Sequence, residues 1–402
     1  MTGESESALD SEPASLMELL SSEEDAIEII DLRPSTITSC DVRNIMLPLI
    51  TNASVRILYL PLDRTDFISS KTMAMVLKNN IGTPIEELHL SHFPPPDQGA
   101  SSISVYSNII SSLKSNKTVK KLHIAPEVVL HESIQASIAS VLYDDSVISS
   151  LMLRDCGLSN TGVTKISCAL ANNSSITVLD LSNNQLGNKG TCSVALALEM
   201  NKTIQKLKLS GTNIGREGGE AIVTALATND SLEVLDMSRN SLDDTVITKL
   251  AKMLKTNESL RQMSLRSNQF STIGALCLSL ALYDRKNIHT VLSCNHTIQY
   301  LDINSNQLSR ECVMHVNKSL RWNAQRSSKN ETIRKKVSSF LAGSDSNCSC
   351  LKSYLGDASI ANKLMPNMLW SVGSNSTALY FLFKNLMVPL SEESSSKTLS
   401  RK

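Results

Sequence analysis

The stretch from residue 176 to residue 186 reads ITVLDLSNNQL, and its apolar spacing recurs along much of the chain. Within it, Ile176, Leu179 and Leu181 occupy the first, fourth and sixth positions. Units with the same spacing begin 28 residues apart at Ile148, Ile176, Ile204, Leu232 and Leu260. Self-similarity at a period of this length is typical of a solenoid built from stacked repeats.

Each unit combines a strand signal with a helix signal. In the unit that begins at Ile204, Leu207 and Leu209 are two residues apart, so both side chains leave the same face of a short strand. Ile222 and Leu226 are four residues apart, which places them on one face of a helix. One unit cannot bury both apolar faces alone, so we expect the units to stack into a continuous parallel sheet backed by helices.

The register extends in both directions from these central units. Ten units are predicted, and they begin at residues 27, 55, 85, 119, 148, 176, 204, 232, 260 and 298. The unit that begins at Leu260 exceeds its neighbours by the stretch from Tyr283 to Leu292. We expect this surplus to extend the preceding helix, and a loop that binds a partner is the alternative.

An amide side chain recurs at the ninth position of the units. Four units carry it as Asn184, Asn240, Asn268 and Asn306, and two others have Cys156 and Thr212 instead. Such an amide can bond the main chain of its own turn and of the adjacent unit.

This pattern resembles the leucine-rich-repeat signature over residues 27–332. The period of 28, with Gly162, Gly190 and Gly218 opening the helical half, is similar to the ribonuclease-inhibitor subclass. That subclass includes the repeat regions of NOD-like receptors, tropomodulins and Ran GTPase-activating proteins. The resemblance implies an α/β solenoid, shaped as a horseshoe or arc, with parallel strands on the concave face and helices on the convex face.

The regions that flank the repeats carry different signals. We expect residues 1–12 to be a disordered acidic leader and residues 13–26 a cap helix, since Ser15 and Glu18 form a capping-box pattern. Apolar clusters between residues 333 and 390 predict a helical C-terminal cap, and a separate module that docks a partner is the alternative. Residues 391–402 are polar and are predicted to be a disordered tail.

Composition narrows the class of function. Lys and Arg total 39, as do Asp and Glu, so the chain lacks the basic excess of a general nucleic-acid or anionic-membrane binder. The nine cysteines are odd in number, and several fall on core positions of the repeat. They indicate buried reduced thiols, and hence a cytoplasmic location with a nuclear one as the alternative.

Two histidine motifs suggest metal chemistry but lack the full set of ligands. His131 and Glu132 open a zincin-like pattern in which Gln135 replaces the second histidine, so we expect an exposed pair at the start of a helix. His89 and His123 share the fifth position of successive units, roughly 5 Å apart on neighbouring strands. No carboxylate or thiol is expected at matching positions, so the sequence does not favour a metal site, and no cofactor is predicted.

Asn-x-Ser/Thr triplets recur with the period of the repeat. They begin at Asn52, Asn116, Asn173, Asn201, Asn229, Asn257, Asn295 and Asn330, each three residues before the pattern of a unit start. This periodicity indicates that they are helix-to-strand turn residues and not glycosylation sites.

A basic cluster follows the last unit. It comprises Arg326, Lys329, Arg334, Lys335 and Lys336. We interpret it as a solvated helix face, with a nuclear-import signal as the alternative.

The concave surface is the predicted binding site. Strand residues that the core does not use form a grid with roughly 5 Å spacing. These candidates are Lys120, Lys121, Arg154, Asp155, Asp180, Lys206, Lys208, Glu233, Asp236, Arg239, Arg261, Arg266, Tyr300 and Asp302. The favoured function is a non-catalytic scaffold that binds an unknown protein partner. The alternatives are a GTPase activator of the Ran GTPase-activating type and an adaptor in actin or innate-sensing pathways.

The repeat register predicts the stability of two neighbouring variants. Leu207→Ala should lower the free energy of unfolding by about 2–5 kcal/mol, because it deletes a core side chain. Lys208→Ala, on the concave surface, should change it by less than about 0.5 kcal/mol. Denaturant unfolding measures both, and equal losses would mean that the register is wrong.

Overall fold

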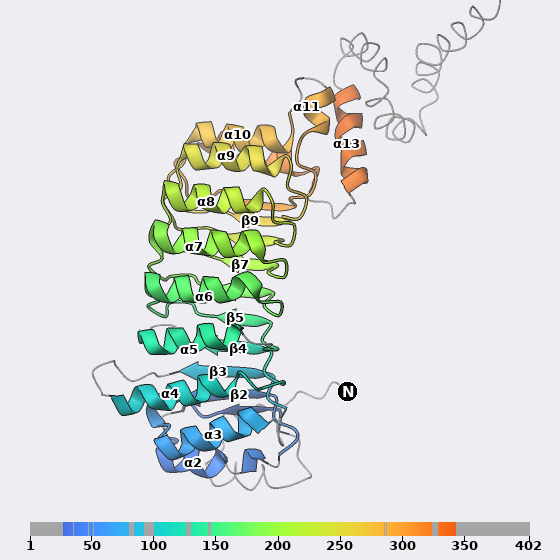
Figure 1. The fold of residues 1–402 in the computed structure, drawn as a ribbon. Coiled ribbons are helices and arrows are strands. Elements are labelled where there is room, and N and C mark those ends of the chain that lie inside the picture. The colour runs from blue at the N-terminus through green and yellow to red at the C-terminus, as the bar shows by residue number, and fades with distance from the viewer. Residues whose placement is uncertain are drawn as a thin grey trace, which may run out of the picture.

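The computed structural model describes residues 27–342, except for residues 35, 47, 51, 80–83, 92–99, 126–129, 144–145, 285, 287 and 324–328. The expected leader and N-terminal cap helix, and the chain beyond residue 342, lie outside these residues. The described residues form one sheet of ten strands in the order β1 to β10, each paired in parallel with the next (Figure 1). The α/β leucine-rich-repeat solenoid that the sequence predicts is confirmed.

Strands and helices alternate along the chain. The strands are β1 (Ile29–Asp31), β2 (Ile57–Pro61), β3 (Glu87–Ser91), β4 (Lys121–Ile124), β5 (Ser150–Met152), β6 (Val178–Asp180), β7 (Lys206–Lys208), β8 (Val234–Asp236), β9 (Gln262–Ser264) and β10 (Tyr300–Asp302). The helices are α2 (Ser39–Met46), α3 (Phe67–Asn79), α4 (Ala100–Ser112), α5 (Glu132–Tyr143), α6 (Asn160–Asn172), α7 (Gly187–Met200), α8 (Arg216–Leu226), α9 (Asp244–Leu254), α10 (Thr272–Leu282), α11 (Ile288–Leu292), α12 (Arg310–Leu320) and α13 (Lys329–Ala342). Short 3-10 turns lie at Pro48–Ile50 and Leu62–Arg64. Among the described helices, none combines the length and the apolar character needed to span a membrane.

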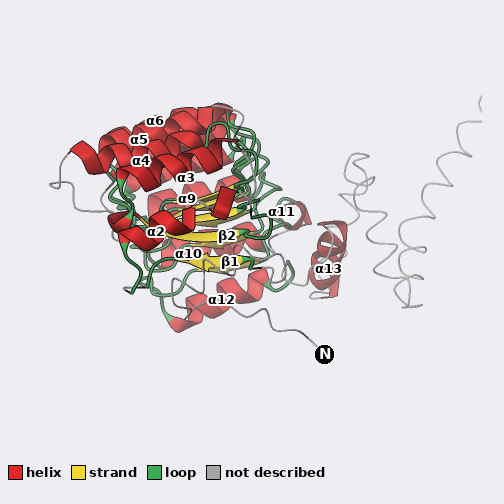
Figure 2. Cartoon of the chain, turned by 90° about the horizontal axis from the view of Figure 1, so that it is seen from below, coloured by secondary structure: helices red, strands yellow, loops and turns green. Residues whose placement is uncertain are grey.

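The core lies between the sheet and the row of helices. Leu179, Leu207 and Leu235 are aligned across adjacent strands, and each is at most 1% exposed. Ile222 and Leu226 of α8 are fully buried on the helix side of the same layer. In the view along the stack of units, the strands form an inner layer and the helices lie outside it (Figure 2). The strand and helix positions of the repeat are therefore confirmed as the core.

The ninth-position asparagines join neighbouring units at the end of each strand. Asn184 accepts hydrogen bonds from the backbone N–H groups of Cys156 and Leu158, at 3.1 and 3.0 Å, in the preceding unit. Its amide donates to the carbonyls of Leu153 and Leu181, at 2.7 and 2.9 Å. Asn240, Asn268 and Asn306 donate equivalent bonds.

The asparagines of the Asn-x-Ser/Thr triplets form a second ladder at the opposite ends of the strands, where each strand begins. The Asn201 carboxamide oxygen accepts from the N–H groups of Thr203 and Ile204, both at 2.9 Å, and so shapes the turn into β7. Its amide donates to the carbonyls of Leu170 and Asn173, at 2.7 and 2.8 Å, in the preceding unit. The same turn and cross-unit bonds recur at Asn116, Asn173, Asn229, Asn257 and Asn295. The interpretation of these residues as helix-to-strand turns is confirmed, and Asn52 makes the same turn bonds. It is wrong for Asn330, because that residue lies in the first turn of α13.

The zincin-like motif is part of this packing. His131 and Glu132 are exposed at the start of α5, as expected. Gln135 is 1% exposed and donates to the Leu130 carbonyl at 2.6 Å. A Cβ at Gly162 would lie 1.5 Å from the Gln135 amide oxygen, so only glycine fits there. Gln135 therefore anchors α5 against the next unit.

The extra stretch after α10 does not extend that helix. The helix ends at Leu282, and Tyr283 caps it in an extended conformation with φ of −158°. Residues Ile288–Leu292 form the separate short helix α11, which contacts α13. The expected helix extension is wrong because the chain leaves the helix at Tyr283 and turns to meet the C-terminal helix.

The basic cluster is likewise not a uniformly solvated face. Lys336 of α13 is 0% exposed, and its ammonium donates to the carbonyls of Leu282 and Asn295, both at 2.6 Å. It therefore joins α13 to the end of α10 and to the second asparagine ladder. Burial lowers the pKa of Lys336 to about 7. Among the other members, Lys329 fits the expectation, since it pairs with Glu258 on the surface, and Arg326 lies outside the described residues.

Asn201→Ala tests the second ladder. It removes partners from two carbonyls and two N–H groups at a residue that is 1% exposed. Each buried group left without a partner costs about 1–3 kcal/mol, so we expect the free energy of unfolding to fall by more than about 3 kcal/mol. Asn317→Ala, on the exposed face of α12, is the matched control and should have little effect. Urea unfolding compares the two, and a small loss at Asn201 would contradict the role of the ladder.

Lys336 predicts a pH-dependent stability. Its pKa is about 7 in the folded chain and 10.5 when unperturbed, so above pH 7 the unfolded chain binds more protons. Since stability rises with pH wherever the unfolded state binds more protons, the contribution of Lys336 to stability should rise from about pH 7 to about pH 10.5. Lys336→Met should abolish this rise, whereas Lys335→Met, which removes a partly exposed ion pair with Glu331, should keep it. Urea unfolding across this pH range is the measurement, and an unchanged slope in Lys336→Met would contradict the assignment.

Candidate functional site

The predicted concave residues lie on one face of the sheet, opposite the core. Nine of them are exposed: Lys120, Lys121, Arg154, Lys206, Glu233, Arg239, Arg261, Arg266 and Tyr300. Asp155, Lys208, Asp236 and Asp302 are partly exposed. The regular spacing of the grid follows from the strand register, because equivalent positions of successive units are aligned.

Asp180 departs from the expected solvated grid. It is 5% exposed, it accepts from the Ser182 N–H at 3.0 Å, and the Lys208 ammonium lies 3.3 Å away. Removing Lys208 would leave a buried carboxylate without its cation, so the expectation that Lys208→Ala is nearly neutral no longer holds. Lys206 is exposed and adjacent to Leu207, and it is the better surface control.

The cations of the grid fall into two groups. Over β3 and β4, Lys120 pairs with Glu86 at 3.0 Å, and Lys121 pairs with Glu87. Over β5 to β9, five cations have no carboxylate partner among the described residues: Arg154, Lys206, Arg239, Arg261 and Arg266. This part of the concave face therefore carries positive charge that is free to meet a partner.

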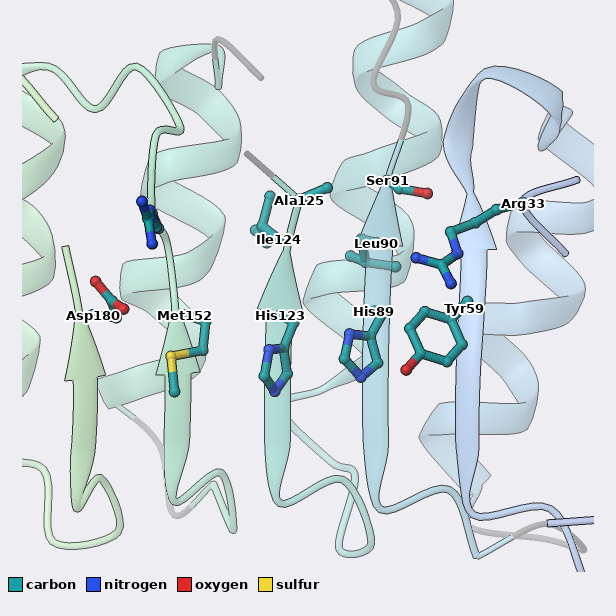
Figure 3. A pocket seen from close by; sticks show the side chains of 11 residues that line it. Arg33, Tyr59, His89, Leu90, Ser91, His123, Ile124, Ala125, Met152 and Asp180 are labelled. Carbon is teal, nitrogen blue, oxygen red and sulfur yellow. The ribbon is translucent and has the colours of Figure 1, made fainter. Parts of the chain in front are cut away.

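A hollow of about 320 Å³ opens over the N-terminal strands (Figure 3). It is lined by Arg33, Tyr59, His89, Leu90, Ser91, His123, Ile124, Ala125, Met152, Arg154 and Asp180. Pro61, Ser91 and Ala125 are the small residues at the seventh position of three consecutive units. Arg33 and Arg154 occupy that position in the flanking units, so two long side chains bound a row of short ones.

Three rings stack across the strands that form this hollow. The centroid of Tyr59 lies 4.2 Å from that of His89, and His89 lies 4.3 Å from His123. The Arg33 guanidinium lies 4.1 Å from the Tyr59 ring centre, and Asp31 holds it with bonds of 2.8 and 2.6 Å. All three rings occupy the fifth position of their units, so the strand spacing of about 4.8 Å sets their separation.

Glu87 lies beside the two histidines. Its carboxylate oxygen is 3.6 Å from the Nε2 atom of His89. The expectation that no carboxylate accompanies His89 and His123 is therefore wrong. Glu87 and His89 are two residues apart on β3, so they share the concave face. The two-residue spacing of Glu87 and His89 is visible in the sequence and could have predicted that they lie together. His92, which follows β3, lies outside the described residues.

The protonation states of this group follow from partial burial. Burial and the neighbouring His123 lower the pKa of His89 to about 4, and burial lowers the pKa of His123. Burial raises the pKa of Glu87, but the hydrogen bond and the charge of Lys121, together with His89, outweigh it and hold that pKa below its usual value. At neutral pH both imidazoles are therefore neutral and the carboxylate is ionised.

Sequence reasoning missed most of the hollow. Arg33, Tyr59, His89 and Met152 were not among the predicted binding residues, although the last three occupy the fifth position that also holds Asp180. All of the predicted binding residues except Tyr300 are charged, so the rings over β2 to β4 are not among them. A comparison of the fifth and seventh positions across all units would have shown the row of rings beside the row of small residues.

A family model described as "Leucine Rich repeat" matches residues 172–191 and 201–223, within the central units. These matches coincide with the strand, asparagine turn and helix seen in the structure. The chain is a leucine-rich-repeat protein. A comparison with curated protein sequences finds no match.

Several solved structures resemble this leucine-rich-repeat protein. Leiomodin-1 actin-binding site 2 is 18% identical, with 54% of this chain and 96% of that chain covered and a TM-score of 0.32. The tropomodulin C-terminal domain of Caenorhabditis elegans is 17% identical, with 41% and 94% covered and a TM-score of 0.34. An internalin of Listeria monocytogenes is 15% identical, with 69% and 68% covered and a TM-score of 0.37. At these identities and scores the likeness does not identify a partner.

Proposed function

We propose that this leucine-rich-repeat protein is a non-catalytic scaffold that binds a protein partner on its concave surface. The observation that carries the proposal is the set of five cations over β5 to β9 that have no carboxylate partner within the described residues. Acidic residues such as Glu233, Asp236 and Asp302 lie among them. A partner with alternating charge, whose acidic groups face Arg154, Arg239 and Arg266, complements this grid.

The hollow supplies an anchor beside the charged grid. Phe, Trp and Tyr together are only 4% of the chain, and one of them, Tyr59, stacks here with two imidazoles beside Met152 and two arginines. Interface energy concentrates in aromatic and Arg residues that fill or line pockets. We therefore place the centre of the interface at the hollow, with the charged grid extending from it toward β9.

The rigidity of the surface favours this role. Both asparagine ladders and the aligned strands hold each concave side chain at a set distance from its neighbours. A partner then pays little entropy to order the surface, since it is already formed. Periodic, prearranged concave surfaces of this type are suited to binding an extended region of a partner protein.

The thiols are consistent with a reducing location. All seven cysteines in the described part of the chain are free, but only Cys156 and Cys294 are buried. The expectation of buried thiols is wrong for the other five, because their positions face outward: Cys40 and Cys168 are exposed, and Cys192, Cys277 and Cys312 are partly exposed. Burial raises the pKa of Cys156 to about 12, so its thiol is held in the unreactive form. We infer a cytoplasmic location, with the nucleus as the alternative.

Reversing the free concave charges tests the proposal. The full chain with Arg154→Glu, Arg239→Glu and Arg266→Glu should lose its specific partner in co-purification with mass spectrometry, with affinity falling about tenfold or more, because like charges then face each other. The matched control carries Lys165→Glu, Lys189→Glu and Lys252→Glu, which are exposed on α6, α7 and α9 and change the net charge equally. Capture that survives the concave reversal but fails with the control would place the interface on the helices and overturn the proposal.

A further inference from the structure

Three side chains with metal-ligating atoms lie close together beside the hollow. Glu87 and His89 of β3 and His123 of β4 each offer one such atom, and these atoms all lie within 4.8 Å of one another. The two histidine rings are visible side by side on adjacent strands in Figure 3. They lie on rigid strands in register, with His89 paired to His123.

The two imidazoles leave buried nitrogen atoms without partners. The Nε2 atoms of His89 and His123 are both shielded from solvent and make no hydrogen bond within the described chain. The contact from His89 to Glu87, at 3.6 Å, is longer than a hydrogen bond. Buried polar atoms without partners are rare and costly, and an unseen ion or water is a standard cause. One ligating atom of each histidine lies within 4.8 Å of a Glu87 carboxylate oxygen, so a cation bound among the three side chains would supply the missing partner.

We propose that Glu87, His89 and His123 form a binding site for a divalent transition-metal ion of the zinc class. Two neutral imidazoles and one carboxylate are a ligand set that zinc accepts, and three protein ligands leave one position open. The open position faces the hollow, where a ligand atom from solvent or from a bound molecule completes the coordination. Neither imidazole has to lose a proton at neutral pH, and the carboxylate is already ionised.

Ion binding requires a defined side-chain rearrangement. The two histidine rings are nearly parallel, with 20° between their planes, so their nitrogen lone pairs do not converge as the rings stand. Zinc lies about 2.0–2.1 Å from an imidazole nitrogen, so both rings must turn toward each other and give up their stacking contact. The backbone need not move, because the ligand atoms are already within 4.8 Å.

Two nearby cations oppose the ion. Lys121 bonds the other carboxylate oxygen of Glu87, and Arg33 lies beyond Tyr59 at the end of the ring stack. Lys121 also orients the carboxylate, in the way that outer partners orient metal ligands. The charge of Arg33 is largely offset by Asp31, at 2.6 Å. These contacts weaken the site without blocking its ligand atoms.

Zinc binding is measured on the full chain by calorimetric titration with Zn²⁺. Cys348→Ser and Cys350→Ser form the background, because these two thiols are close enough in the sequence to bind one ion together. One zinc ion per chain is expected, and it should raise the unfolding temperature. His89→Gln, His123→Gln and Glu87→Gln should each weaken binding by more than about tenfold, since losing an outer partner alone costs tenfold or more. His131→Gln, at an exposed histidine on α5, is the matched control and should bind zinc as the background does.

Cobalt absorption identifies the ligands independently. Co²⁺ at the proposed site should show the visible bands of a tetrahedral nitrogen and oxygen site without thiolate charge transfer, and His123→Gln should remove these bands. Far-UV circular dichroism checks that each variant remains folded. Equal zinc affinity in His89→Gln, His123→Gln and the background would overturn the proposal, as would no binding by the background chain. The site does not rest on the scaffold function, because zinc is titrated in the absence of any partner.

Discussion

The hydrogen bonds that asparagine side chains make between units are the interaction on which the rest of this structure depends. At the end of each strand, and again at the end of each helix, the chain turns and exposes backbone groups inside the stack. Asn184 and Asn201 satisfy such groups in their own unit and in the preceding one at the same time. Because a buried group without a partner costs about 1–3 kcal/mol, the two ladders fix the position of the central units relative to one another.

This constraint turns sequence position into spatial proximity. Residues at the same position of successive units lie about 4.8 Å apart, whatever their chemical nature. The fifth position therefore becomes a column that runs from Asp31 through Tyr59, His89 and His123 and continues with Met152 and Asp180. Rings in the first part of the column stack on one another, whereas charges in the later part pair, as Asp180 does with Lys208.

The same columns divide the concave face into two regions with different chemistry. Near β3 and β4 the lysines are paired, and the hollow presents ring edges, a carboxylate and buried imidazole nitrogens. Toward β9 the cations are exposed and have no acidic partner in the described chain. The first region suits a small ligand such as a metal ion, and the second suits the charged surface of a protein. The two regions meet at Arg154. An ion bound in the first region would therefore lie next to a protein bound to the second region.

Periodicity alone determined the units, the parallel sheet, the apolar core and the face on which candidates such as Arg239 lie, because these features depend on spacing that repeats along the chain. Tertiary structure alone decided the features that break the period. Lys336 is buried because α13 packs against α11 and reaches the end of α10, and α11 separates from α10 to meet it. The shielding of Asp180 and the meeting of Glu87 with two imidazoles depend on which neighbours share a column and how their side chains turn. Such contacts join residues far apart in sequence at positions that the repeat does not constrain, so no local pattern of residues encodes them.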